Sequence, residues 1–185
     1  MTTSVNIIKI LTSFRTKVVI IMVLVLSFSL SAYAQELLWE KLNSKANTLF
    51  KQKRYPDALS VSEEALKVAE DTFGPDHPKV ATSLNTIAEL YIINGTYAEI
   101  EPLYKRALKI NEKALGPDNP DVAISLNNLA ELYYNQGRYT EAEPLYKRAL
   151  KILENTLGPD HPEVALTLKS LKALYKNIGK GEWIE

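Results

Sequence analysis

The chain of 185 residues contains no cysteine, so packing rather than disulfides must hold its fold together. The same absence excludes thiolate catalysis, cysteine zinc sites and a lipid-modified cysteine. A charge bias is also lacking, because 22 Lys and Arg residues balance 22 Asp and Glu residues. Without residues 1–34, which carry three basic residues and no acidic ones, 19 basic residues face 22 acidic ones, a net charge of about −3. The composition therefore predicts no binding to nucleic acid or to anionic lipid.

The first 34 residues have the order of a secretory signal peptide. Residues 1–17 carry only positive charge, residues 18–30 are an uncharged apolar run, and Ala32-Tyr33-Ala34 has the small-residue pattern of a cleavage site. This order predicts cleavage before Gln35 and export of the rest of the chain to the periplasm or the medium. The alternative is an uncleaved anchor, since the uncharged stretch 18–35 is just long enough to span a bilayer. Both interpretations place the remainder of the chain outside the cytoplasm.

A pentapeptide, Gly-Pro-Asp-His/Asn-Pro, recurs with a period of 42 residues, at 74–78, 116–120 and 158–162. A fixed period of this length is typical of stacked repeats. The Gly suits the left-handed conformation that ends a helix, and the second Pro suits the first position of the next helix. Each copy therefore predicts that one helix ends and another begins within five residues.

Each repeat unit divides into two helices. Asn94-Gly95 and Gln136-Gly137 predict a turn inside the second and third units, and Lys53-Arg54 marks a weaker break in the first. Apolar residues with the i, i+3, i+4, i+7 spacing of an amphipathic helix precede these turns. In the second and third units they are Leu84, Ile87, Ala88, Tyr91 and Leu126, Leu129, Ala130, Tyr133. The sequence thus predicts an all-α fold of helical hairpins.

Residues 125–133, 136–139 and 141–150 resemble the 42-residue tetratricopeptide repeat (TPR) of the kinesin light chain type almost letter for letter. The resemblance implies a right-handed superhelical stack of TPR hairpins over residues 35–178. The implied units are repeats at about 37–73, 78–115 and 120–157, a capping helix at 162–178 and a short tail at 179–185.

The sequence departs from the repeat pattern in the last helix and in the second repeat. The small residue at the closest contact between the helices of a repeat is Ala in three copies, but Lys172 occupies this place in the last helix. Because no partner helix follows, we expect Lys172 to point to solvent, as in a capping element. Ile100 stands where the other repeats have Ala58 and Ala142, which predicts slight splaying of the second hairpin.

No combination of residues predicts catalysis, a metal site or a cofactor. His77 and His161 occupy one position of the pentapeptide, with Asn119 in the middle copy, which indicates a role at helix starts. A Ser/His/acid combination and a Gly-rich phosphate loop are both missing. We therefore expect a protein that is not an enzyme.

In the resembled family the first helices of the repeats line a concave surface, which implies a row of partner-binding positions. In this chain they are Asn43, Asn47, Phe50, Asn85, Glu89, Ile92, Asn127, Glu131, Tyr134, Lys169 and Lys176. Asn is a mediocre helix former, so its periodic return needs a reason. Either the amides bind the backbone of a peptide, or each bonds to the neighbouring repeat and serves stacking alone.

The charges of this row indicate the chemistry of a ligand. Basic residues occur only in the last helix, so the carboxylate clamp of chaperone-binding relatives is not expected. Glu89 and Glu131 instead indicate a ligand with a basic or amide group. The sequence as a whole predicts an exported scaffold for a protein or peptide partner, which touches a membrane only through an uncleaved N-terminal segment. The alternative is a structural or self-associating assembly factor; the oligomeric state and the partner's identity stay open.

Overall fold

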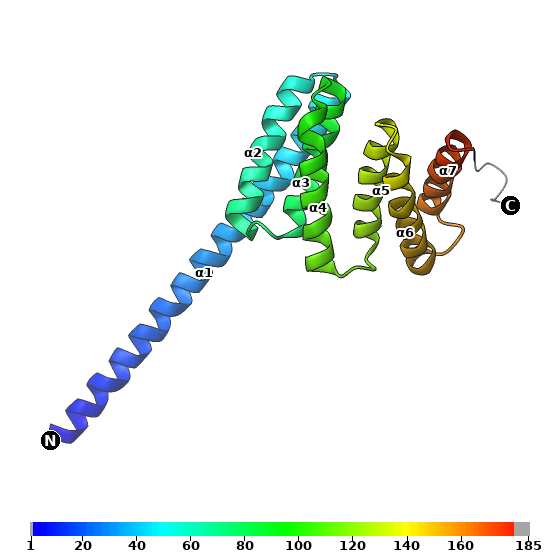
Figure 1. Cartoon of the computed structure of the whole chain (residues 1–185). Helices are drawn as coiled ribbons and strands as arrows, with labels where there is room; N and C mark the ends of the chain where they lie inside the picture. Colours follow the sequence, from blue (N-terminus) through cyan, green and yellow to red (C-terminus); the bar gives the residue numbers. More distant parts are fainter. Residues whose placement is uncertain (1, 180–185) are drawn as a thin grey trace.

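The computed structural model describes residues 2–179, with the side chains of residues 16–27 and 29–179, and the regular elements in this range are all helical. Their bounds are α1 Thr2–Lys51, α2 Tyr55–Phe73, α3 Pro78–Asn94, η1 Tyr97–Glu99, α4 Ile100–Leu115, α5 Pro120–Asn135, α6 Tyr139–Leu157 and α7 Pro162–Asn177. The helices pack as the hairpins α1/α2, α3/α4 and α5/α6, which follow one another in chain order with α7 at the end (Figure 1). The predicted all-α stack of hairpins is confirmed.

The pentapeptides form the connectors between hairpins. The Gly that opens each copy has a φ between 87° and 89°, a conformation that residues with a Cβ rarely adopt. The next helix begins at the second Pro of each copy. The side chain before that Pro caps the helix: His77 and His161 each accept a backbone N–H at 3.2 Å, and Asn119 does so at 2.8 Å. The prediction that both histidines serve helix starts is confirmed.

Alanine lets the two helices of each hairpin approach closely. Ala46, Ala88 and Ala130 expose at most 1% of their surface. Lys172, at the corresponding place of α7, is exposed, as expected for a helix that ends the stack. Ile100 is fully buried, and the three residues before it form the 3-10 helix η1 where α2 and α6 are already α-helical. The larger side chain is therefore accommodated next to an altered first turn.

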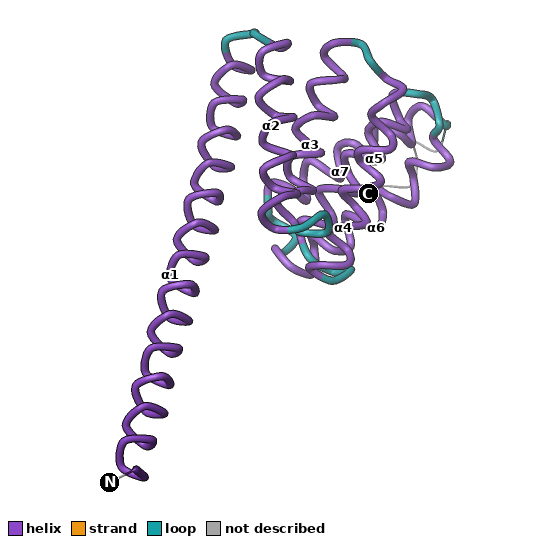
Figure 2. The backbone as a smooth tube through the Cα atoms, turned by 90° about the vertical axis from the view of Figure 1, so that its left-hand side faces the viewer, coloured by secondary structure: helices purple, strands orange, loops and turns teal. Residues whose placement is uncertain are grey.

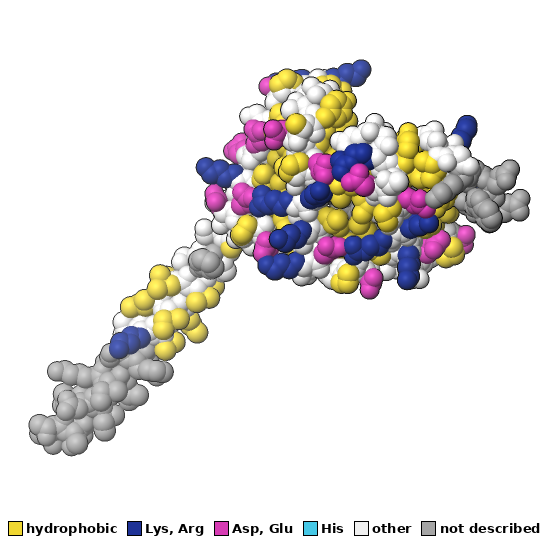
Figure 3. Space-filling view, in the orientation of Figure 1, with side chains coloured by type: hydrophobic (Ala, Val, Ile, Leu, Met, Phe, Trp, Pro, Cys, Tyr) yellow, Lys and Arg dark blue, Asp and Glu magenta, His cyan; other side chains and the backbone are white. Residues whose placement is uncertain are grey.

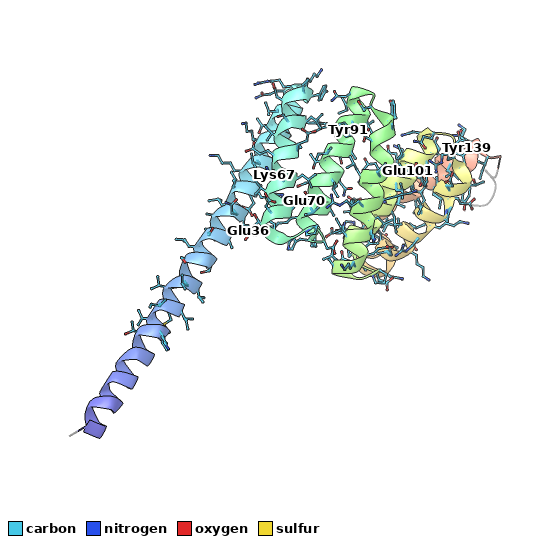
Figure 4. The ribbon with its side chains drawn as sticks, turned by 60° about the vertical axis from the view of Figure 1, so that its left-hand side comes forward. Glu36, Lys67, Glu70, Tyr91, Glu101 and Tyr139 are labelled. Atoms are coloured by element: carbon cyan, nitrogen blue, oxygen red, sulfur yellow. The ribbon has the colours of Figure 1, made fainter. Side chains whose placement is uncertain are left out.

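Two arginines repeat one bridge between successive hairpins. Arg106 on α4 pairs with Glu70 on α2 at 2.6 Å, and Arg148 on α6 pairs with Glu112 on α4 at 2.5 Å. Each also donates to the carbonyl of the first Pro in the intervening connector, at 3.4 and 3.3 Å. Figure 4 labels Glu70 on α2. Bridges with the same geometry hold the second helices in the same relation from one repeat to the next.

A buried hydroxyl also joins neighbouring hairpins at a fixed repeat position. Ser83 on α3 accepts a hydrogen bond from the indole of Trp39 on α1 at 3.1 Å. Ser125 on α5 accepts one from the amide of Asn111 on α4 at 3.0 Å. The donors differ between repeats, so the sequence period alone does not reveal this link.

The helix α1 is longer than the others because the apolar N-terminal segment continues the first repeat helix. Its free part projects away from the stack (Figures 1 and 2), and apolar side chains gather on the section between the grey end and the stack (Figure 3). The stretch Thr16–Lys51 is long and apolar enough to cross a membrane. Its most apolar window has a mean hydropathy of 2.1, and no residue of that window is buried. Contacts with α3 come later along α1, where Glu36 pairs with Lys79. Figure 4 labels Glu36 at this junction.

Candidate functional site

The face made by α1, α3 and α5 carries two adjoining hollows. The first, of about 370 Å³, is lined by Trp39, Asn43, Asn47 and Phe50 on α1 and by Thr86 and Glu89 on α3, among others. The second, of about 290 Å³, is lined by Asn85, Thr86 and Glu89 on α3 and by Asp121, Ile124 and Asn128 on α5, among others. Because Thr82, Thr86 and Glu89 line both hollows, together they form one groove that crosses α3, here called the α3 groove.

The α3 groove brings together five of the residues that the sequence singled out. They are Asn43, Asn47, Phe50, Asn85 and Glu89. Helical spacing explains the grouping, because residues four apart share a face of α1 and the 42-residue period carries the same face to α3. The predicted row of the first two repeats is therefore a physically continuous surface.

The other predicted residues lie outside the lining of these two hollows. Ile92 is 36% exposed near the end of α3. On α5, Tyr134 packs against the ring of Tyr139, with centroids 5.6 Å apart, and accepts a hydrogen bond from Asn177 on α7. Lys169 and Lys176 are exposed on α7. The groove therefore contains predicted residues from only the first two of the four helices in the row, α1 and α3.

Sequence reasoning missed several residues that line the groove. These are chiefly Trp39, Thr82, Thr86, Ile124 and Asn128. The period carried a signal for four of them, since Thr82 and Ile124 share one repeat position and Thr86 and Asn128 share another. These four face the preceding repeat, whereas the predicted row faces the following one. The period gave no signal for Trp39, because Ala81 and Ala123 stand at its position in the next repeats.

The amide of Asn127 bonds to the neighbouring repeat. Its Nδ2 donates to Oγ1 of Thr167 on α7 at 2.7 Å, and that hydroxyl in turn donates to the carbonyl of Glu163 at 2.9 Å. The stacking interpretation therefore holds for this half of the Asn127 amide. The other half is unused: the Oδ1 atoms of Asn85 and Asn127 are both buried and have no hydrogen-bond partner among the described residues. A buried acceptor without a partner carries a cost in free energy that an N–H donor of a ligand would relieve.

Two carboxylates along the groove side of the stack lack a basic neighbour. Neither Glu89 nor Glu131 forms an ion pair with a described residue. Reduced solvation, followed by repulsion from Glu131, raises the pKa of Glu89 above its usual value of 4.5. Burial, followed by the negative charges of Glu89 and Glu131, raises the pKa of Tyr104, and burial with Glu131 raises that of Tyr146 to about 12. Burial is the larger cause of each shift, and the negative charges of Glu89 and Glu131 add to it.

The groove has no arrangement for holding a metal. Within the residues whose side chains are described, no group of three or more His, Asp or Glu side chains lies close enough to bind an ion. Both histidines cap helices, and neither lines the two hollows. What the groove offers is shape, hydrogen-bond acceptors and negative charge.

Comparison with protein families assigns most of the chain. The family model described as tetratricopeptide repeat matches residues 40–95, 84–155 and 122–180. No curated protein matches the chain.

Solved structures of helical repeat proteins have the same fold. BtubC (BKLC) from P. vanneervenii is 28% identical, with a TM-score of 0.73 over 80% of this chain and 59% of that one. A putative kinesin light chain protein from Podospora anserina is 23% identical, with a TM-score of 0.69 over 76% of this chain and 67% of that one. The first TPR of Spaghetti (RPAP3), bound to an HSP90 peptide, is 18% identical, with a TM-score of 0.55 over 76% of this chain and 93% of that one. The chain thus spans about three fifths of the length of BtubC.

Proposed function

Because the chain belongs to the tetratricopeptide-repeat family, we propose that it is a scaffold that binds a peptide or protein partner in the α3 groove and catalyses no reaction. Stacked helical repeats present extended surfaces to partners, and members of this family are typically scaffolds without enzymatic activity. The α3 groove lies on rigid helices, which keeps the entropic cost of ordering the site low when a partner binds.

The observation that carries this proposal is the set of unsatisfied groups in and beside the groove. Glu89 has no ion pair, and the buried Oδ1 atoms of Asn85 and Asn127 have no donor among the described residues. An extended peptide has a backbone N–H at every residue other than proline and can supply such donors in a row. The two Oδ1 atoms lie 42 residues apart at the same repeat position, and because both are buried, a peptide would reach them only after the amide side chains turn outward.

The peptide-bound relative supports the capacity of the fold but not the identity of the ligand. In that protein a TPR domain holds the peptide SRMEEVD, which is acidic near its C-terminus. At 18% identity the comparison carries the fold alone. A peptide of that charge would meet repulsion from Glu89 and Glu131 here, so the proposed partner segment is basic or neutral.

The location that the proposal assigns is outside the cytoplasm, periplasmic or secreted, after cleavage between Ala34 and Gln35. The exposed apolar stretch of α1 that follows Thr16 supports a segment that first meets the export machinery or the membrane. N-terminal sequencing of the protein from the producing cell tests this point. A first residue at Gln35 would support cleavage, whereas a membrane-bound chain that keeps residues 1–34 would establish the anchor.

Site-specific photo-crosslinking tests the proposed groove. A photoreactive amino acid is placed at Asn47, which lines the groove, and in a matched variant at Lys67, which is exposed on α2 (Figure 4). In the native envelope we expect a defined crosslinked product from position 47 and none of the same mass from position 67. The same product from both positions, or from 67 alone, would contradict binding in the groove.

A second candidate function, self-association, is favoured by the uncovered outer face of α7. Leu166 on this helix is 58% exposed, and Lys169, Lys172 and Lys176 are exposed beside it. Light scattering coupled to size exclusion distinguishes the two functions. A concentration-dependent oligomer that Leu166→Ser dissolves would support self-association, and a monomer at all concentrations would exclude it.

A further inference from the structure

The hollow between α1 and α3 has a polar lining that accepts hydrogen bonds more readily than it donates them. Thr82 and Thr86 each donate their hydroxyl to a carbonyl of their own helix, at 3.3 and 3.2 Å. Asn43 donates its amide to the carbonyl of Trp39 at 2.8 Å. The hydroxyl lone pairs, the Asn43 Oδ1, the Glu89 carboxylate and the Asn47 amide, which can both donate and accept, are then the groups left to face a ligand. Such a lining complements a ligand group that carries donors.

The rest of the hollow is apolar and aromatic. Ala46 and Leu90 are each only 1% exposed and line its base. Half-buried Trp39 and Phe50 also line it. Glu89 is the one charged residue among those that line the hollow. The ligand group that fits is therefore a flexible apolar stem with a positively charged end.

The ring of Trp39 already lies beside a cation. The ammonium of Lys79 is 4.8 Å from the centre of that ring and is neutralised by Glu36. The hollow itself is lined by Glu89 without such a counter-charge. The intramolecular contact shows how an aromatic wall and an acid of this surface hold a basic side chain between them.

We propose that the hollow between α1 and α3 receives an arginine side chain of the partner. A guanidinium group has five N–H donors and no acceptor, pairs in a fork with a carboxylate, and stacks on aromatic rings. Its three methylenes pack against the apolar base while the charged plane meets Glu89 and Asn43. The inference rests on the proposed function, because it names the chemistry of the side chain that the α3 groove takes from its partner.

The test uses the full chain in non-ionic detergent micelles and the intrinsic reporter Trp39. Trp183→Phe leaves Trp39 as the remaining tryptophan of the two. The probe is N-acetyl-arginine methylamide, and its matched control is the citrulline analogue, which keeps the shape and loses the charge. Binding is read at constant ionic strength from the indole N–H signal of Trp39 by NMR. We expect a saturable shift with the arginine compound and about tenfold weaker binding of the citrulline compound, the scale of a charge-assisted hydrogen bond.

Two variants locate the charge that matters. Glu89→Gln removes the acid that lines the hollow and should weaken arginine binding about fivefold or more. Glu64→Gln removes an exposed acid on α2 that does not line the hollow, and should change binding less than about twofold. Equal binding of arginine and citrulline, equal effects of the two variants, or no saturable shift would each overturn the arginine assignment.

The outcome is separable from that of the proposed function. Crosslinking from position 47 without arginine binding would support the groove as a partner site and refute the assignment of an arginine side chain to the hollow. If arginine binding saturates at Trp39 while position 47 captures no partner, the hollow binds arginine as proposed, but the proposed scaffold role is contradicted.

Discussion

Carboxylates on two sides of the same stack differ in their partners. Glu101 on α4 bonds to Arg138 at 2.8 Å and Lys105 at 2.7 Å, and accepts the hydroxyl of Tyr133 at 2.9 Å. The Arg138 and Lys105 contacts, in this order, lower the pKa of Glu101 to about 2. Glu89 in the groove has no such neighbour, and its pKa is raised.

The difference separates the charges that serve the fold from those that the proposed function assigns to a partner. Glu70, Glu101 and Glu112 each meet an arginine of the next helix pair, so their charge stabilises stacking. Glu89 and Glu131 recur with the same 42-residue period, yet neither forms an ion pair with a residue that the structure describes. An unneutralised charge at a periodic position costs stability, which is expected where function requires it.

The largest expected effect concerns the close contact between the two helices of the third hairpin, at Ala130. Ala130→Leu should lower the free energy of unfolding by about 1–3 kcal/mol, because Ala130 is fully buried and a larger side chain overpacks the contact. Lys172→Leu is the matched control at the equivalent place of α7, and it should cost almost nothing because this side chain is exposed. Urea denaturation followed by circular dichroism measures both. Equal losses would contradict the capping role of α7.

Asn85 and Asn127 test the same distinction, because each amide could bond either to a neighbouring repeat or to a ligand. Asn85→Ala and Asn127→Ala should each weaken partner binding by about 0.5–1.5 kcal/mol, the net scale of a hydrogen bond. Asn127→Ala should also lower the melting temperature, since it removes the bond to Thr167, whereas Asn85→Ala should leave it nearly unchanged. Calorimetry of binding and of unfolding on the same samples separates the two effects. Unchanged affinity in both variants would assign the asparagines to stacking alone.

Low pH should weaken the stabilisation that Glu101 gains from its pairing with Arg138 and Lys105. The pKa of Glu101 is lower in the folded chain than the usual 4.5, so its contribution is fully present above pH 4.5 and is lost as the pH falls toward 2. Glu101→Gln should cost about 0.5–1 kcal/mol at pH 7, a modest value because the pair is partly exposed. The variant should also show a smaller loss of stability between pH 4.5 and 2 than the parent chain. If the melting temperatures of the variant and the parent chain fell in parallel between pH 4.5 and 2, Glu101 would not be the group responsible for the loss.

The smallest expected effect has the opposite sign. Because the pKa of Glu89 is raised in the folded chain, its charged form is disfavoured, and the stability that depends on it falls as the pH rises through that pKa. Glu89→Gln should therefore stabilise the chain at pH 7 by about 0.2–0.5 kcal/mol, the scale of a like-charge repulsion on a helix surface. The gain should vanish below pH 4.5, where Glu89 in the parent chain is protonated. A destabilised Glu89→Gln chain at pH 7 would show that this acid serves the fold.

Much of the fold was predictable because its signals are local. The pentapeptides combine a Gly with positive φ, a capping His or Asn and a Pro at the first helical position within five residues. The apolar stripe repeats at helical spacing, and its period sets how many hairpins stack. The exposure of Lys172 was also predictable, because a charged residue stands where the other first helices carry alanine.

The site was predictable only in part. Asn43, Asn85 and Glu89 were found because one helical face and one period define them, whereas Trp39 and Thr86 line the groove from rows that the period did not single out. The role of Asn127 was open between two interpretations, and a side chain 40 residues away decided half of it. Whether an amide faces a ligand or a neighbouring helix depends on that neighbour's rotamer and distance.

The sequence by itself determined the helices, their pairing and which positions repeat on one face of the first helices, because capping, turn chemistry and apolar periodicity act within a few residues. The tertiary structure decided which of the chemically identical side chains are free. Glu89 and Glu101 are both glutamates on helices of the second repeat, and only the packing of later helices gives Glu101 its Arg138 and leaves Glu89 without an ion pair among the described residues. Electrostatic energy depends on distances of a few ångströms between atoms that lie far apart in the chain.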